Sequence, residues 1–222
     1  MQNTNLIWVD GVPVSKHFDD PYFSADNGLA ESRHVFLAGN NLPERFCNGF
    51  HIGETGFGTG LNLLAAWQLW EQSGQKSALG FTSFEAYPMS PENMAKALSK
   101  WPELNNFTQR FLAALQPDYS IDLPTLKFRM ILGDAAQTLP RWQGHADAWF
   151  LDGFSPDKNP DMWSDDLMQQ VGLHSSKTAS FATYTAAGHI RRKLAKAGFT
   201  VERVKGHGKK RHMTIGKMLH AK

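Results

Sequence analysis

The stretch "GETGFGTG", residues 53–60, decides the fold. The preceding "FHIGE" (50–54) is typical of a buried strand, and "GLNLLAAWQLWEQ" (60–72) has apolar residues at helical spacing. The alternate glycines let the backbone turn tightly and approach a ligand closely, and the first N–H groups of the helix point to the same place. The sequence therefore predicts a ligand site where a strand of an α/β sheet opens into a helix.

The spacing of the glycines indicates which ligand. A dinucleotide fingerprint, G-x-G-x-x-G, would place a glycine where Leu61 stands, so nicotinamide or flavin binding is disfavoured. An acid followed by alternate glycines is instead the form used by S-adenosylmethionine (SAM) methyltransferases. In this region the predicted cofactor-binding residues are Glu54, Gly56, Phe57, Gly58, Gly60 and Asn62.

Strands and helices continue to alternate after this loop. Such alternation predicts a mostly parallel sheet with ligands beyond the carboxyl ends of its strands. Ser90 is a candidate N-cap of the helix that follows the second strand. The other predicted elements are strands at 78–86, 126–134, 146–153, 178–185, 199–205 and 212–218, and a helix at 187–198 that Gly198 ends.

Acids stand at the ends of two of these strands. Glu85 ends the second strand, where a carboxylate can accept hydrogen bonds from both ribose hydroxyls, and Asp134 ends the third, where it can accept from the adenine amine. Either acid alone is as readily explained as a turn former or helix cap. Together with Glu54 they make three acids in register around a glycine loop, which favours nucleoside binding.

Residues 1–49 do not fit the alternation, and we expect an N-terminal extension packed on a methyltransferase domain at 50–222. The extension is predicted to contain a hairpin at 6–15 and a helix at 27–39 that ends at its final glycine. Its loop "FDDPYFSADNG" (18–28) is polar and aromatic enough to line a site, although loops of this composition are common.

Composition limits the remaining possibilities. A chain of 222 residues suits one well-cored domain with an appendage. Cys47 is the only cysteine, so no internal disulfide or cysteine cluster is possible, and the nine histidines include no close pair with an adjacent acid that would suggest a metal site. The first residues lack the pattern of a secretion signal, and no apolar run approaches the roughly 18 residues of a membrane helix. We expect a cytoplasmic protein without a metal.

Charge is distributed unevenly along the chain. The overall net charge is +2, but residues 189–222 hold 11 Lys and Arg against one acid, while residues 1–188 hold 12 against 20 acids. A basic end of this kind hints at nucleic-acid contact, although basic runs are more often solvated surface.

Five blocks, "HIGETGFGTGLNLL", "SFEAYP", "DAWFLDGFSPDKNPDMW", "TYTAAGHIRRKLAKAGF" and "KGHGKKRHM", together resemble the methyltransferase domain of the MnmC family, which makes 5-methylaminomethyl-2-thiouridine in bacterial tRNA. The N-terminal "VPVSKHFDDPYFSADNGLAESRHVFLAGN" is also similar, so the resemblance covers nearly the whole chain. It implies a class I methyltransferase fold with strand order 3-2-1-4-5-7-6. It further implies SAM as donor and the aminomethyl group of the tRNA wobble uridine as acceptor.

Bifunctional members of that family also carry an FAD-dependent oxidase that acts before methylation. This chain ends at Lys222 and has no second glycine fingerprint, so we expect it to supply only the methylation, without FAD. A separate FAD-dependent oxidase is then a candidate partner acting upstream.

The acceptor chemistry gives Asp152 a role. A primary alkyl amine resembles the lysine side chain, whose pKa of about 10.4 keeps it almost wholly protonated at neutral pH. The protonated nitrogen has no lone pair with which to attack the methyl group. A carboxylate at the end of the fourth strand can attract the ammonium form and aim the neutral amine at the donor methyl, with proton acceptance as its second task. The predicted catalytic residues are Asp152 and Tyr184, which ends the fifth strand.

Other residues are candidates for contacting the RNA. Phe154 would stack on the base and Lys158 would meet phosphate, although loop packing and solvent exposure explain them equally well. The full predicted set is Phe154, Lys158, Asn159, Arg191, Arg192, Lys205, Lys209, Lys210 and Arg211.

Two alternatives stay open at this point. The first is a SAM-dependent N-methyltransferase that acts on another amine. DNA adenine is disfavoured as that amine, because the "LDGFSP" block of this chain departs from the Asp-Pro-Pro-Tyr type of loop found in methyltransferases of exocyclic base amines. The second is a non-catalytic RNA-binding protein on a methyltransferase scaffold, against which the intact glycine loop and acids argue.

Overall fold

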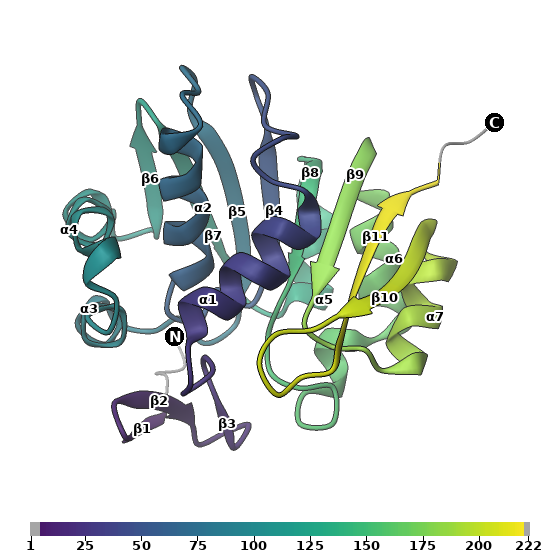
Figure 1. Ribbon diagram of the computed structural model, residues 1–222, viewed down its shortest axis with the longest axis horizontal. Helices are drawn as coiled ribbons and strands as arrows, with labels where there is room; N and C mark the ends of the chain where they lie inside the picture. Colours follow the sequence, from purple (N-terminus) through teal and green to yellow (C-terminus); the bar gives the residue numbers. More distant parts are fainter. Residues whose placement is uncertain (1–4, 220–222) are drawn as a thin grey trace.

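The computed structural model describes residues 5–219, which form a large central sheet flanked by helices and a small separate sheet near the N-terminus (Figure 1). The small sheet contains β1 (Leu6–Val9), β2 (Val12–Ser15) and β3 (Asp20–Pro21). The large sheet contains β4 (His51–Thr55), β5 (Leu79–Glu85), β6 (Ser120–Leu123), β7 (Leu126–Leu132), β8 (Ala146–Leu151), β9 (Ser175–Thr183), β10 (Phe199–Lys205) and β11 (His212–Met218). The α-helices are α1 (Gly28–Ser32), α2 (Leu61–Gln72), α3 (Pro91–Leu98), α4 (Asn105–Ala114), α5 (Ala135–Thr138), α6 (Asp165–Leu173) and α7 (Gly188–Lys196).

The order of the large sheet is β6-β7-β5-β4-β8-β9-β11-β10. Strands β7, β5, β4, β8 and β9 run parallel, whereas β11 is antiparallel to both of its neighbours. Counting from β4 and leaving aside the edge strand β6, this order is 3-2-1-4-5-7-6, which confirms the expected fold. The strand β6, which has four residues and pairs antiparallel with β7, was not predicted from the sequence.

Two cores cover the two faces of the sheet. Side chains of neighbouring strand residues point to opposite faces, and β8 shows this in its consecutive buried rings Trp149 and Phe150. Phe150 belongs to the core beneath α2 and the N-terminal segment, and Trp149 belongs to the core beneath α6 and α7. Because both faces are covered there, the central parallel strands β4, β5 and β8 are almost entirely buried, and the groups available for chemistry lie at their ends.

The N-terminal segment confirms the predicted hairpin and corrects the predicted helix. α1 begins after Asn27, whose side chain accepts a hydrogen bond from the Ala30 N–H, but a π-helical turn (Arg33–Leu37) and a 3-10 turn (Ala38–Asn40) follow it. The segment does not end at Gly39 as expected; it ends where Asn41 adopts a left-handed conformation. Gly39 instead allows close packing, because a Cβ there would lie 2.8 Å from the Ala182 side chain on β9.

This segment shares the core of the sheet. Leu29 and Val35 are buried in the same cluster as Ile52 of β4, as expected for an extension packed on the sheet. A domain boundary after residue 49 stays a prediction.

Candidate active site

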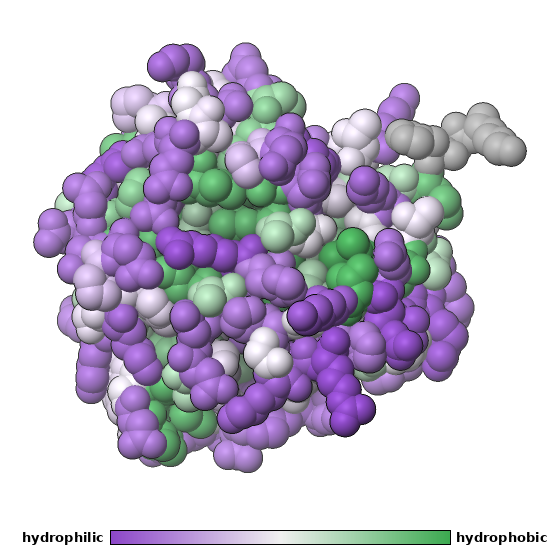
Figure 2. All heavy atoms as spheres, in the orientation of Figure 1, coloured by the Kyte–Doolittle hydropathy of each residue, from purple (hydrophilic) through white to green (hydrophobic). Residues whose placement is uncertain are grey.

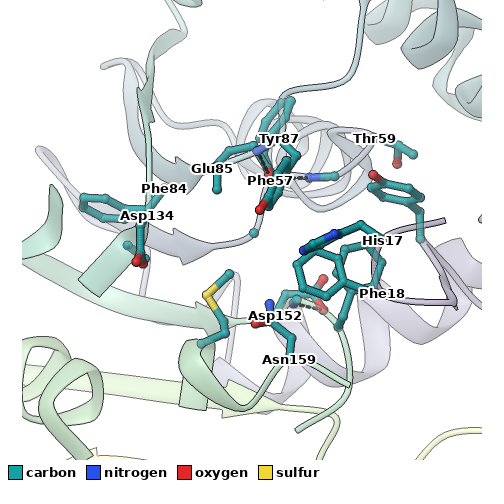
Figure 3. A pocket seen from close by; sticks show the side chains of 18 of the residues that line it. His17, Phe18, Phe57, Thr59, Phe84, Glu85, Tyr87, Asp134, Asp152 and Asn159 are labelled. Atoms are coloured by element: carbon teal, nitrogen blue, oxygen red, sulfur yellow. Dashed lines mark hydrogen bonds between the residues drawn. The ribbon is translucent and has the colours of Figure 1, made fainter. Parts of the chain in front are cut away.

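The loops that follow β4, β5, β7 and β8 open into one pocket at the carboxyl ends of the strands. Figure 3 shows side chains from these loops and from the N-terminal segment converging on it. Of the predicted cofactor and catalytic residues, those that line the pocket are Gly56, Phe57, Gly58, Asn62, Glu85, Asp134 and Asp152.

The glycine loop has the conformation that its sequence requires. Gly56, Gly58 and Gly60 have φ angles of +78°, +57° and +83°, which side-chain-bearing residues rarely adopt. A Cβ on Gly56 would lie 3.0 Å from the Cα of Gly153, so the loop runs directly against the one that carries Asp152. Gly60 is the N-cap of α2, and although it does not line the pocket it turns the chain into the helix.

Glu85 organises the glycine loop from the end of β5. Its carboxylate accepts hydrogen bonds from the Gly58 N–H (3.0 Å) and the Tyr87 N–H (2.8 Å). Burial raises the pKa of Glu85, while these backbone donors act in the opposite direction. These hydrogen bonds fix the Glu85 carboxylate at the wall of the pocket, which the residue lines.

Asp134 caps a helix and also lines the pocket. Its Oδ1 accepts a hydrogen bond from the Ala136 N–H at 2.9 Å and so caps α5, and the same residue lines the pocket. The helix cap therefore holds the carboxylate at the pocket wall.

Glu54 lies behind the pocket and does not line it. It is fully buried, and its carboxylate accepts hydrogen bonds from the Ser83 Oγ (2.7 Å) and the Asn62 Nδ2 (3.0 Å). Burial raises the pKa of Glu54 well above its usual range. The structure thus gives this acid a supporting position.

Asp152 occupies the centre of the site. Its Oδ1 accepts a hydrogen bond from the Gly153 N–H (2.8 Å) and its Oδ2 accepts one from the Asn62 Nδ2 (2.8 Å). Burial raises the pKa of Asp152 to about 6, and the hydrogen bonds and the charge of Lys210 limit this rise. A carboxylate with this pKa is a stronger base than an ordinary aspartate and is still ionised at neutral pH.

Tyr184 supports the Asp152 loop from outside the pocket. Its hydroxyl donates a hydrogen bond to the Gly153 carbonyl oxygen at 2.8 Å, and the Lys210 ammonium lies 4.2 Å from its ring centre. Burial raises the pKa of Tyr184 well above its usual value, so the hydroxyl stays protonated. The geometry makes Tyr184 a positioning residue of the loop.

An aromatic wall closes one side of the pocket. Phe154 stacks on Phe18, with ring centres 4.6 Å apart, and meets the edge of Tyr22 at 5.1 Å. Phe18 in turn contacts the rings of His17 and Tyr87. Of these aromatic residues only Phe154 was predicted to lie at the site, and the polar and aromatic composition of the 18–28 loop was the available signal for Phe18 and Tyr22.

Lys158 and the N-terminal loop hold this wall together. Its ammonium binds the Asp19 carbonyl oxygen and lies 3.3 Å from the Asp19 carboxylate and 3.7 Å from that of Asp20. The Ser155 N–H also donates to Asp20, at 3.0 Å. Lys158 is therefore paired with protein carboxylates, a contact that the sequence did not predict, and its contact with phosphate stays a prediction. The neighbouring Asn159 lines the pocket.

The predicted basic residues divide into two groups. Lys210 forms an ion pair with Glu31 of α1 at 2.9 Å. Lys209 forms an ion pair at 3.4 Å with Asp26, which precedes α1, so both pairs connect the β10–β11 loop with the α1 region. Hydrophilic side chains predominate over this loop in Figure 2. Lys205 and Arg211 are exposed at the same loop, and Arg191 and Arg192 lie in the N-terminal half of α7. None of these six basic residues lines the pocket.

Within residues 5–219, no group of three or more His, Cys, Asp or Glu side chains is arranged to hold a metal ion. Among the same residues, no helix has the length and apolar character needed to cross a membrane.

The sheet order, the glycine loop and the acids at the strand ends define a class I SAM-dependent methyltransferase. The sequence profile of the S-adenosyl-L-methionine-dependent methyltransferase family matches residues 99–219, more than half of the 222 residues. The chain belongs to this family.

Two relatives extend the similarity over almost the whole chain. MnmC of Chromobacterium violaceum, a tRNA 5-methylaminomethyl-2-thiouridine biosynthesis bifunctional protein, is 45% identical over 96% of this chain and 34% of its own length. MnmC of Vibrio campbellii is 43% identical over 98% of this chain and 36% of its own length. The chain thus spans about a third of the length of these curated relatives.

Solved structures agree on the fold. MnmC2 from Aquifex aeolicus superposes with a TM-score of 0.78 at 25% identity, over 100% of this chain and 72% of that one. Spermidine synthase from Thermotoga maritima gives a TM-score of 0.56 over 96% of this chain and 71% of that one. At its 8% identity the second likeness shows the fold alone.

Proposed function

We propose that the chain uses SAM to methylate the aminomethyl group of 5-aminomethyl-(2-thio)uridine at the tRNA wobble position, giving 5-methylaminomethyl-(2-thio)uridine. The observation that carries the proposal is the ionisable carboxylate of Asp152, held in the pocket directly against the glycine loop. The 45% identity to a protein named for biosynthesis of this nucleoside supports the choice of acceptor. Acting on tRNA, the protein would work in the cytoplasm.

The residues at the pocket fit SAM. A ligand can approach the backbone of the glycine loop closely, because Gly56 and Gly58 line the pocket without side chains and have φ angles that other residues rarely adopt. Glu85 would accept hydrogen bonds from the ribose hydroxyls and Asp134 from the adenine amine, and the first turn of α2 would face the methionine end. When bound, SAM supplies an electrophilic methyl group.

Asp152 then handles the acceptor amine. Its negative charge attracts the ammonium form, and its oxygens orient the nitrogen by hydrogen bonding. One proton passes from the ammonium to the carboxylate, which frees the nitrogen lone pair for attack. The amine must itself be produced by a reaction that leaves an aminomethyl group on the base, for which a separate FAD-dependent oxidase is the candidate partner.

The rate should fall on the acid side of the pKa of Asp152. If the ionised carboxylate binds the ammonium form, kcat/KM decreases about tenfold per pH unit below about 6 and is level above it. The measurement is kcat/KM between about pH 5 and 9 at fixed ionic strength. A rate that climbs steadily across this range without a break near 6 would mean that only the neutral amine is bound, contrary to the role given to Asp152.

Binding of tRNA should depend on salt and on the β10–β11 loop. Replacing the exposed residues Lys205, Lys209 and Arg211 by alanine is expected to lower the slope of log Kd against log salt by about 2 to 3, since each lost phosphate contact contributes about 0.7 to 0.9. The measurement is tRNA binding by fluorescence anisotropy between about 50 and 200 mM salt.

The control replaces three exposed lysines near the opposite ends of the strands. Alanine at Lys76, Lys127 and Lys177 removes the same charge and should leave the salt slope unchanged. Equal losses for the two triple variants would place the RNA elsewhere.

The decisive experiment incubates the protein with labelled SAM and three acceptors: tRNA bearing the aminomethyl uridine, unmodified tRNA and free polyamines. Label is expected only in the modified tRNA, at the wobble nucleoside. Label only in polyamines would replace the proposal by an amine methyltransferase of another substrate, and the absence of label in any acceptor would favour a non-catalytic RNA-binding role.

A further inference from the structure

The side chain of Asn62 joins four elements at the back of the pocket. Its Oδ1 accepts a hydrogen bond from the buried Ser32 Oγ of α1 at 2.6 Å. Its Nδ2 donates to the Glu54 Oε1 on β4 at 3.0 Å and to the Asp152 Oδ2 after β8 at 2.8 Å. The amide therefore has each of its N–H groups and its oxygen engaged with protein, although Asn62 borders the pocket.

The two carboxylates set which way the Asn62 amide faces, and Ser32 holds it in that orientation. The Ser32 hydroxyl donates to the Oδ1, and the two N–H groups point toward the carboxylates of Glu54 and Asp152. If the amide were reversed, its oxygen would face both carboxylates without a hydrogen between them. Ser32 is 3% exposed and belongs to the N-terminal segment, so this segment reaches Asp152 through one asparagine.

The amide separates two carboxylates of different character. Glu54 is fully buried behind it, and Asp152 faces the pocket in front. The other charged or titratable groups that act on Asp152 are Glu31 of α1, Lys210 of the β10–β11 loop and Tyr184 after β9. The hydrogen bonds to the two Asp152 oxygens come instead from the Asn62 side chain and from the Gly153 backbone N–H.

We propose that Asn62 is a positioning residue for Asp152 and not a cofactor ligand, with Ser32 fixing the orientation of its amide. This inference rests on the proposed function for its catalytic consequence, and on hydrogen-bond geometry alone for its structural content. Two donors, one on each carboxylate oxygen, hold the Asp152 plane in a single orientation, and each oxygen keeps a lone pair for the acceptor amine.

The first test needs neither cofactor nor acceptor. The side-chain carboxyl of Asp152 is titrated by NMR in ¹³C-aspartate-labelled protein, with its signal assigned from the Asp152→Asn spectrum. Asn62→Leu, which has a similar shape but no donor, is expected to shift the Asp152 midpoint upward by about one pH unit, because a hydrogen bond to the charged form is lost. Ser32→Ala should shift it in the same direction by a smaller amount, and it carries the test if Asn62→Leu does not fold.

The second test separates positioning from cofactor binding. Asn62→Leu is expected to change the calorimetric Kd of SAM by less than about threefold, while methyl transfer slows at least about tenfold and its acidic limb follows the NMR midpoint upward. Asn106→Leu, an exposed asparagine of α4, is the matched control and should change none of these quantities.

The outcomes distinguish the two proposals. A SAM Kd raised more than about tenfold with an unmoved Asp152 midpoint would make Asn62 a cofactor ligand and overturn the inference. A shifted midpoint in a protein whose wild type transfers no methyl to the aminomethyl tRNA would support the positioning role and reject the proposed acceptor.

Discussion

Replacing Asp152 by alanine is expected to lower kcat/KM for methyl transfer by roughly 10²- to 10⁴-fold, the range that a positioned base contributes. The loss has two sources: the ammonium form of the acceptor is no longer attracted, and no carboxylate remains to orient the nitrogen or take its proton. Asp152→Asn keeps the shape but not the charge and should fall in the same range. The measurement is single-turnover transfer to tRNA bearing the aminomethyl uridine.

Binding of SAM should survive the same substitutions. The predicted cofactor contacts come from the glycine loop, Glu85 and Asp134, so the calorimetric Kd of SAM is expected to change by less than about threefold. Asp157→Ala removes an exposed acid from the same loop and should leave both quantities unchanged. A SAM affinity that disappears together with the activity would show that the division between donor and acceptor residues is wrong.

Removing the Glu85 carboxylate should have its large effect on the other half of the site. Glu85→Ala deletes the acceptor for the Gly58 and Tyr87 N–H groups and the proposed acceptor for the ribose hydroxyls. Hydrogen bonds to a charged group contribute about 1.5 to 3 kcal/mol each, so two lost ribose contacts correspond to a Kd for SAM raised at least about 100-fold. Calorimetry measures this directly.

The control for Glu85 is Glu92→Ala, an exposed acid on α3 that should leave the Kd of SAM unaltered. A thermal melt of both variants separates loss of the ligand site from loss of the fold. A folded Glu85→Ala protein with normal SAM affinity would contradict the assignment of the ribose to this carboxylate.

The sheet could be predicted well because its signals are local. The strand β8, covered on both faces, is a short apolar run followed by a turn, and its adjacent residues Trp149 and Phe150 are both buried. The misses were features decided by packing. A glycine such as Gly39 often ends a helix, but here its lack of a side chain allows contact with Ala182. The four residues of β6 are a short segment that pairs with β7.

The same contrast between local signals and packing explains which parts of the site could be predicted. Acids at strand ends could be placed together because parallel strands bring their carboxyl ends to one edge. The partners of Lys158 could not be predicted, since Asp19 lies 139 positions away in the sequence. The contacts of Lys210 with Glu31 and with the Tyr184 ring could not be predicted either. Lys210 was expected to contact RNA, and in the structure it packs on the residue that supports the Asp152 loop.

The attachment of Lys158 to Asp19 and Asp20 has a consequence for building chimaeras. The floor of the pocket comes from the sheet, but its roof is formed jointly by a loop near the start of the chain and a loop two thirds of the way along it. A hybrid that takes its N-terminal segment from another methyltransferase would leave Lys158 without its two carboxylates and Phe154 without the ring of Phe18. For protein engineering, these two loops are one unit of exchange.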